Sequence, residues 1–205
     1  MSSHLVSNFW YLYDKVINFE TIRKIKRIGN NKEWIDGVVK NYDNEEAYSK
    51  IMSRRSSQVC FFGGEQWLID LMWSYMEEAN KQAGWEYDID YVEDMQLTKY
   101  GEGMYYKWHY DGLGDHNGVF GKDYPELLQG RVRKLSLTLL LNNEYEGGHF
   151  EFTEYHDENT EVQRPDFNNA GSIIVFPSHL EHRVTEITKG TRNSLVAWFI
   201  GPPFR

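Results

Sequence analysis

The chain has very little cysteine: Cys60 is the only one among its 205 residues. A single cysteine excludes an internal disulfide framework and any cysteine-rich zinc module, and it favours a reducing compartment. Long apolar runs are also missing, because no stretch approaches the roughly 18 apolar residues of a membrane-spanning helix. The first residues lack the basic and apolar blocks of a signal peptide. We therefore expect a cytoplasmic protein with no membrane partner.

Basic residues are outnumbered by acidic ones. Lys and Arg total 22 against 31 Asp and Glu, which gives a formal net charge of −9. Non-specific binding to nucleic acid needs basic residues that neutralise phosphates, so we expect no nucleic-acid partner. A basic run at residues 23–27 is better interpreted as the solvated face of a short helix.

The composition predicts one globular domain. Apolar residues make up 40% of the chain and aromatic residues 16%, which suits a sizeable core in a single domain over residues 1–205. Residues 1–84 have a mixed, mainly helical character. Asn18 is a candidate N-cap for a helix over residues 19–29, and a second helix is expected over about residues 65–82.

From Trp85 onward the pattern changes to short β-branched and aromatic segments separated by Gly, Asn and Pro. This pattern predicts an α+β, mainly β fold: a double-stranded β-helix (jelly roll) or barrel over residues 85–205, buttressed by the N-terminal helices. The candidate strands are residues 94–100, 105–110, 134–141, 149–152, 172–176, 182–187 and 193–200.

Histidine and carboxylate side chains are the informative candidates for chemistry. Residues i and i+2 of a strand point to the same face, so His109 and Asp111 are expected to present an imidazole and a carboxylate side by side. A third ligand from a late strand, His182 in preference to His179, completes a 2-His-1-carboxylate set of the kind found in non-haem Fe(II) oxygenases. Arg192 lies near the start of the last strand and is suited to a two-donor grip on a carboxylate. The alternative interpretation of His109 and Asp111 is a hydrogen-bonded structural pair.

Three segments carry ordered motifs. Residues 100–111 match Y-x-x-G-x-x-Y-x-x-H-x-D, residues 141–148 end in Gly-Gly, and residues 182–192 contain H-x-V followed by G-x-R. In this order they resemble the prolyl-4-hydroxylase-like 2-oxoglutarate/Fe(II) dioxygenases, and the middle segment resembles the small bacterial and phage members. Three ordered blocks are a much more specific signal than any one of them.

The resemblance implies roles for particular residues. It implies that His109, Asp111 and His182 bind iron and that Arg192 pairs with the C5 carboxylate of 2-oxoglutarate. It also implies that Tyr100 helps to hold this co-substrate. The implied cofactors are Fe(II), 2-oxoglutarate and O2, with ascorbate as an additional candidate.

Two positions depart from the family's pattern. Leu140 stands where some relatives place a co-substrate-binding Tyr, and His149 follows Gly-Gly where many relatives carry Glu. Residues 112–130 form a long glycine-rich loop directly after the ligand pair. We expect this loop to act as a lid over the substrate rather than as an inert surface loop, and its acidic residues favour a neutral or basic substrate.

The expected function is therefore an Fe(II)- and 2-oxoglutarate-dependent dioxygenase, a prolyl-4-hydroxylase-like hydroxylase that produces succinate and CO2. Its substrate is expected to be a peptide or protein side chain or a small molecule. Two alternatives stay open: a metal-dependent hydrolase that activates water on the same three ligands, and a non-catalytic jelly-roll binding module.

Overall fold

The computed structural model describes residues 5–6, 9–37, 55–112, 118–156 and 159–204. These residues contain two helices, α1 (Phe19–Asn30) and α3 (Gln66–Gln82), and many strands. The strands are β1 (Leu5–Val6), β2 (Tyr11–Tyr13), β3 (Ile35–Asp36), β4 (Arg55–Ser56), β5 (Gln58–Phe62), β6 (Tyr91–Val92), β7 (Met95–Tyr100), β8 (Tyr105–His109), β9 (Val132–Leu140), β10 (Tyr145–Gly147), β11 (Phe150–His156), β12 (Asn159–Gln163), β13 (Ile173–Pro177), β14 (His182–Val184), β15 (Ile187–Gly190) and β16 (Arg192–Gly201).

The strands form two large antiparallel sheets and a short ribbon. The larger sheet has the order β1-β2-β13-β9-β16-β7-β5-β3, with β6 beside β16, and the smaller has the order β12-β11-β14-β8-β4. The chain crosses between them repeatedly: β7, β9, β13 and β16 belong to the larger sheet, and β8, β11, β12 and β14 to the smaller. Strands β10 and β15 pair separately. Segments from β7 to β16 are therefore brought together at the space between the sheets.

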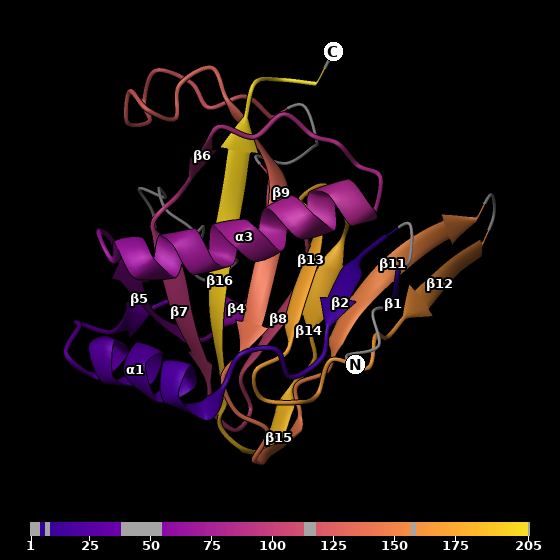
Figure 1. Cartoon of the computed structure of the whole chain (residues 1–205). Helices are drawn as coiled ribbons and strands as arrows, with labels where there is room; N and C mark the ends of the chain where they lie inside the picture. The colour runs from indigo at the N-terminus through magenta and orange to yellow at the C-terminus, as the bar shows by residue number, and fades with distance from the viewer. Residues whose placement is uncertain (1–4, 7–8, 38–54, 113–117, 157–158, 205) are drawn as a thin grey trace.

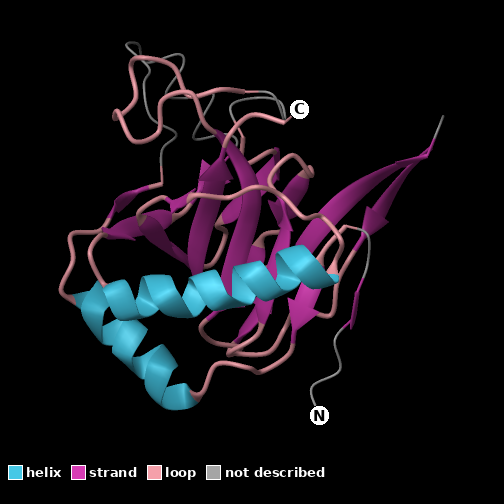
Figure 2. Ribbon diagram, turned by 45° about the horizontal axis from the view of Figure 1, so that its top comes forward, coloured by secondary structure: helices cyan, strands magenta, loops and turns pink. Residues whose placement is uncertain are grey.

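Both helices cover one face of the larger sheet (Figures 1 and 2). The predicted cap is present, because the Asn18 side chain accepts a hydrogen bond from the Thr21 N–H at 2.9 Å. The apolar stripe of α3 (Leu68, Met72, Met76 and Ala79) is buried, in one core cluster with Leu135, Leu137 and Leu139 of β9 and Leu195 and Phe199 of β16. This core confirms the two predicted helices and leaves the other face of the sheet free to build a site.

The basic run on α1 is solvated, as predicted. Arg23, Lys24 and Arg27 are exposed, whereas Ile22 and Ile25 on the other face of α1 are buried. No helix in the described part of the chain is long and apolar enough to cross a membrane.

A second, smaller core fills the space between the two sheets. Ile174 and Phe176 of β13 meet Phe150 and Phe152 of β11 there, with Leu140, Tyr100 and Val184 in the same cluster. The Phe152 ring lies 5.1 Å from the Phe176 ring, in an edge-on arrangement. Aromatic side chains thus exclude water from the interior that the candidate site shares.

Each strand expected after residue 85 is present, with ends shifted by a few residues, and the segment expected at 182–187 is divided between β14 and β15. Residues 1–84 hold more strand than their mainly helical prediction suggests. In particular, β5 adds to β7 over five residue pairs. That strand is fixed by pairing with a distant edge, which local periodicity does not reveal.

The long loop after Asp111 is described in part. Residues 113–117 of the expected lid lie outside the described residues. The remainder is closed by two backbone hydrogen bonds of 2.9 Å, from Phe120 N–H to the Arg131 carbonyl and from Gly130 N–H to the Phe120 carbonyl. A lid function for residues 112–130 stays a prediction.

Candidate metal centre

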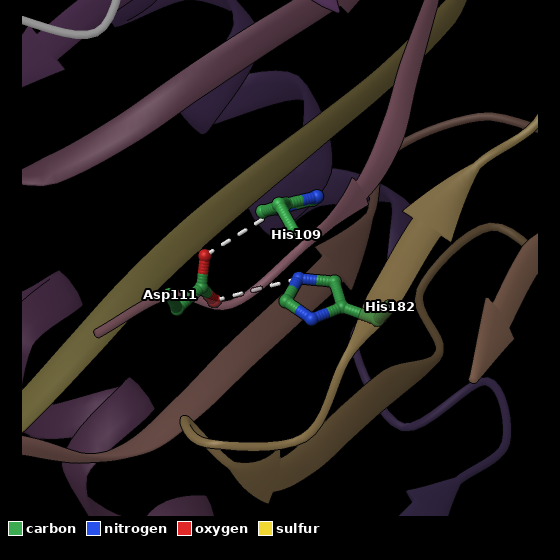
Figure 3. A group of neighbouring side chains, drawn as sticks. All are labelled: His109, Asp111 and His182. Carbon is green, nitrogen blue, oxygen red and sulfur yellow. Dashed lines mark ion pairs between the residues drawn. The ribbon is translucent and has the colours of Figure 1, made fainter. Parts of the chain in front are cut away.

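Two strands of the smaller sheet and the turn after β8 bring three side chains together. His109 ends β8 and His182 begins β14, and the two are paired across the antiparallel ladder. Asp111 follows two residues beyond His109. The distance from His109 Nε2 to Asp111 Oδ1 is 3.7 Å, and from His182 Nε2 to Asp111 Oδ2 it is 3.6 Å (Figure 3). One ligand atom from each residue lies within 4.8 Å of the others, which is the convergence expected of a metal site.

A β-bulge sets the direction of His109. His182 pairs with His109 and Val184 pairs with Tyr106, so two steps on β14 face three steps on β8. The extra residue turns Tyr106 and His109 toward the same face, and their rings stack with centroids 3.4 Å apart. Bulges commonly re-aim side chains beside active sites.

Backbone carbonyls hold both imidazole rings in place. Nδ1 of His109 lies 2.8 Å from the Lys107 carbonyl, and Nδ1 of His182 lies 2.9 Å from the Leu180 carbonyl. A carbonyl only accepts, so each Nδ1 donates its proton, and each Nε2 lies on the side of Asp111. Burial, reinforced by the neighbouring His182, lowers the pKa of His109 to about 3. His109 is therefore neutral and able to bind a cation.

Asp111 provides the negative charge. Its side chain is 9% exposed, and burial by itself raises the pKa of this carboxyl. His182, His109, the Ser136 hydroxyl and Arg133 together outweigh burial and leave the pKa below its ordinary value. Two imidazoles and one carboxylate, with no fourth ligand in the set among the described residues, suit Fe(II) and other divalent transition metals.

Arg192 is buried, with no counter-ion among the residues that the structure describes. It is 1% exposed, and its Nη1 donates to the Ser194 hydroxyl at 3.1 Å. Its Nε and Nη2 have no hydrogen-bond partner among the described residues, and no acidic side chain in those residues forms an ion pair with it. An uncompensated buried guanidinium is costly, so this position calls for an anion with two acceptor oxygens. The distal carboxylate of 2-oxoglutarate fits that requirement.

Tyr100 and Leu140 lie on the two strands, β7 and β9, that flank β16, the strand that begins at Arg192. Tyr100 is the ladder partner of Arg192, whose Cζ lies 5.9 Å from the Tyr100 ring. Leu140 pairs with Ser194 from the other side and is fully buried, so it supplies apolar surface where some relatives supply a hydroxyl. A role of Tyr100 in holding the co-substrate stays a prediction.

His149 and His179 do not join the centre. His149 is partly buried, and its backbone N–H bonds to the Thr185 hydroxyl at 2.8 Å. Neither His149 nor His179 belongs to the convergent set, and no further set of three His, Cys, Asp or Glu side chains in the described residues could hold a metal. The preference for His182 over His179 agrees with this geometry.

Two arginines near the centre were not identified from the sequence. Arg55 is 7% exposed and lies 4.7 Å from the Tyr106 ring, which itself stacks on His109. Arg133 donates from Nη1 to the backbone carbonyl of Asp111 at 2.7 Å. Each lies at or near the beginning of a strand and has another basic residue close by in the sequence. Such residues are ordinarily expected to be exposed to solvent, so their position near the centre is known only from the tertiary structure.

A mainly β fold of two antiparallel sheets brings two histidines and one carboxylate together, and this is the donor set of non-haem metal centres of the oxygenase type. The 2OG-Fe(II) oxygenase superfamily model matches residues 95–200, just over half of the chain. The chain belongs to this superfamily. Tyr100, His109, Asp111, His182 and Arg192 all lie within the matched region.

Curated relatives and solved structures agree with this assignment. A PKHD-type hydroxylase of Picosynechococcus is 34% identical over 109 residues, which cover 52% of this chain and 42% of the relative. One from Xylella fastidiosa is 33% identical over 105 residues, covering 50% and 42%. The chain thus spans less than half the length of these relatives.

The solved structures show the fold. A Pseudomonas putida prolyl-4-hydroxylase superposes with a TM-score of 0.60 at 18% identity, over 93% of this chain and 91% of that one. The viral collagen prolyl hydroxylase of Paramecium bursaria Chlorella virus-1 superposes with a TM-score of 0.61 at 20% identity, over 94% and 96%.

Proposed function

We propose that this chain is an Fe(II)- and 2-oxoglutarate-dependent hydroxylase of prolyl-4-hydroxylase-like type, which releases succinate and CO2. The observation that carries the proposal is one shared interior. His182 packs against Phe150 and Phe176, and Tyr100, the ladder partner of Arg192, belongs to the same core cluster. A metal-binding set and a buried anion-binding arginine therefore open onto the same water-poor space.

The same proposal assigns the fold to the double-stranded β-helix. Eight strands support it: β7, β16, β9 and β13 lie side by side in the larger sheet, and β8, β14, β11 and β12 lie side by side in the smaller. Along the chain these strands alternate between the two sheets, except that β11 and β12 are successive and pair with each other in the smaller sheet, in the order that two Greek keys generate. The helices α1 and α3 buttress the larger sheet from outside.

In this mechanism the protein holds and orients its reactants. Fe(II), 2-oxoglutarate and O2, when bound, would supply the oxidising chemistry: the keto acid would lose CO2 and take one oxygen atom of O2 to become succinate, and the other oxygen atom would enter a C–H bond of the substrate. His109 and His182 would hold the metal through their imidazoles, and Asp111 would hold it through its carboxylate. Arg192 orients the co-substrate by its distal carboxylate. The surrounding aromatic side chains exclude water from the reacting groups.

Production of succinate is the direct test. Purified protein supplied with Fe(II), 2-oxoglutarate and O2 is expected to form succinate, and Asp111→Ala is expected to form none. Rigorously iron-free protein that hydrolyses ester or amide substrates with Zn(II), and forms no succinate with Fe(II), would support the hydrolase alternative. Protein that binds neither metal nor 2-oxoglutarate would support the non-catalytic binding module.

A peptide or protein side chain is the proposed substrate class, with a small molecule as the alternative. One solved neighbour is a prolyl hydroxylase from Trichoplax adhaerens in complex with a hypoxia inducible factor peptide fragment, with a TM-score of 0.61 at 17% identity. Mass spectrometry of proline-containing peptide libraries and of free amino acids after incubation with the protein separates the two classes. Cytoplasmic location and a requirement for ascorbate stay predictions.

A further inference from the structure

The backbone of Asp111 is held on both sides, although this residue lies beyond the end of β8. Its N–H donates to the Ser178 carbonyl at 3.1 Å. Its own carbonyl accepts from Arg133 Nη1 at 2.7 Å. A metal-binding carboxylate keeps its direction only if its backbone is fixed, and no strand ladder fixes this one. The two hydrogen bonds replace the missing ladder.

Arg133 reaches this position because β9 contains a bulge. Phe199 of β16 pairs with Leu135, but the next residue, Ile200, pairs with Arg133, so Lys134 is the extra residue. Leu135 faces the helices, in the core beneath α3. Paired residues share a face and successive residues alternate, so the bulge turns Arg133 to the opposite face, toward the candidate metal centre.

The guanidinium of Arg133 is itself held in place. Its Nε and Nη2 donate to the two carboxylate oxygens of Glu93 at 2.5 and 2.7 Å. Its Cζ lies 4.3 Å from the Trp198 ring. The Glu93 N–H donates to the Trp198 carbonyl at 3.0 Å, which ties the carboxylate to β16. With two nitrogens engaged by Glu93, the third is directed at the Asp111 carbonyl.

We propose that Arg133 is a positioning residue for the metal ligand Asp111, and that Glu93 sets the orientation of Arg133. This inference rests on the proposed function, since it takes Asp111 to be a ligand. Arg133 acts through the backbone: it fixes the carbonyl of Asp111 and thereby the rotation of the chain at the point where the carboxylate leaves it. One planar guanidinium can donate to both oxygens of the Glu93 carboxylate and, from its third nitrogen, to the Asp111 carbonyl. The single ammonium group of lysine cannot make this set of bonds.

Metal affinity is the measurement that tests this role. Co(II) alone serves as the probe, because its visible absorption reports protein ligands without O2 or substrate. Removing an outer hydrogen-bond partner of a metal ligand weakens binding by about ten- to hundredfold, and we expect an increase of that size in the Co(II) Kd of Arg133→Gln. We expect the Co(II) Kd of Arg133→Lys to be raised as well, and that of Glu93→Gln to be raised by a smaller factor.

Arg131→Gln is the matched control. Arg131 also pairs with a carboxylate, that of Asp90, through Nε at 3.0 Å and Nη2 at 3.1 Å, but it makes no contact with Asp111 in the described residues. Its Co(II) Kd is expected to equal that of the wild type. If circular dichroism shows that Arg133→Gln does not fold, the Co(II) Kd values of Arg133→Lys and Glu93→Gln test the proposal instead.

A Co(II) Kd within twofold of the wild type in every folded Arg133 and Glu93 variant would overturn the proposal. Unchanged Co(II) binding with loss of substrate hydroxylation would overturn it too, and would assign Arg133 to substrate contact. Failure of the proposed function is a different result: the wild type would bind Co(II) with a protein-ligand spectrum, respond to Arg133→Gln, and yet form no succinate with Fe(II).

Discussion

Replacing Arg192 by methionine is expected to stabilise the ligand-free protein while abolishing its response to 2-oxoglutarate. Arg192 is 1% exposed, and two of its three nitrogen atoms have no hydrogen-bond partner in the described residues. Methionine is of similar length and carries no N–H group. It fills the same space against Tyr100 without a buried, unpaired charge.

The size of the effect follows from the unpaired groups. Each buried polar group without a partner costs about 1–3 kcal/mol. Removing Nε and Nη2, and subtracting the lost bond from Nη1 to Ser194, leaves a net gain of about 1–3 kcal/mol in the free energy of unfolding. One kcal/mol corresponds to roughly 2–4 °C in Tm for a domain of this size. The lost charge-assisted bonds to 2-oxoglutarate, at about 1.5–3 kcal/mol each, raise its Kd by about a hundredfold or more.

Thermal denaturation with and without 2-oxoglutarate measures both effects, with Mn(II) present throughout. A ligand at a hundred times its Kd adds about 2.7 kcal/mol to the stability of the wild type. Arg192→Met is expected to start at a higher Tm and to show no further rise. The control is Arg183→Met, which removes an arginine paired with Glu151 and is expected to lower Tm but keep the full response. A lower Tm in Arg192→Met, or a full response to 2-oxoglutarate, would refute the reasoning.

Three further outcomes are expected. His182→Ala abolishes succinate formation rather than slowing it, because two ligands cannot hold the metal; residual turnover in a chelator-washed sample argues against this ligand. Zn(II), Co(II) and Ni(II) inhibit by displacing Fe(II) and support no succinate formation, since imidazole and carboxylate ligands bind these ions more tightly. Although burial raises the pKa of Glu151, hydrogen bonds from Arg164 and Arg183 hold it below its ordinary value. The unfolded state therefore takes up a proton that the folded state does not, and stability falls as pH drops below about 4.5. Urea denaturation between pH 6 and 3 should show a shallower loss for Glu151→Gln, and an equally steep loss would contradict this assignment.

Local rules account for the elements that could be predicted from the sequence. The helix over α1 follows from Asn18 and from isoleucines at helical spacing, and both features are present in the structure. Strands β7, β8, β9, β11, β13, β14 and β16 follow from β-branched and aromatic segments between turn residues, whereas β10 and β12 lie outside the predicted segments. Strands β4 and β5 escaped prediction because β4 pairs with β8 and β5 with β7, edges that are distant in the sequence.

The three candidate ligands could be selected from the sequence, but the geometry that unites them differs from the expected one. Simple alternation along a strand suggested that His109 and Asp111 share a face. In the structure β8 ends at His109, and Asp111 lies beyond it, held by the Ser178 carbonyl and by Arg133. The residue types were therefore a sound guide to which side chains converge, while the physical cause of their convergence is tertiary.

Two bulges explain why the rest of the centre was hidden. One extra residue in β8 aligns Tyr106 with His109, and one in β9 turns Arg133 away from the face of its neighbour Leu135. A period-two pattern assigns these residues to the wrong faces, because a single inserted residue reverses the alternation for everything beyond it. Each bulge is visible only in the pairing with a partner strand, β14 or β16, far along the chain. The surroundings of a metal centre are thus hardest to predict where the ladder departs from regularity, and those departures are what direct Tyr106, His109 and Arg133 toward it.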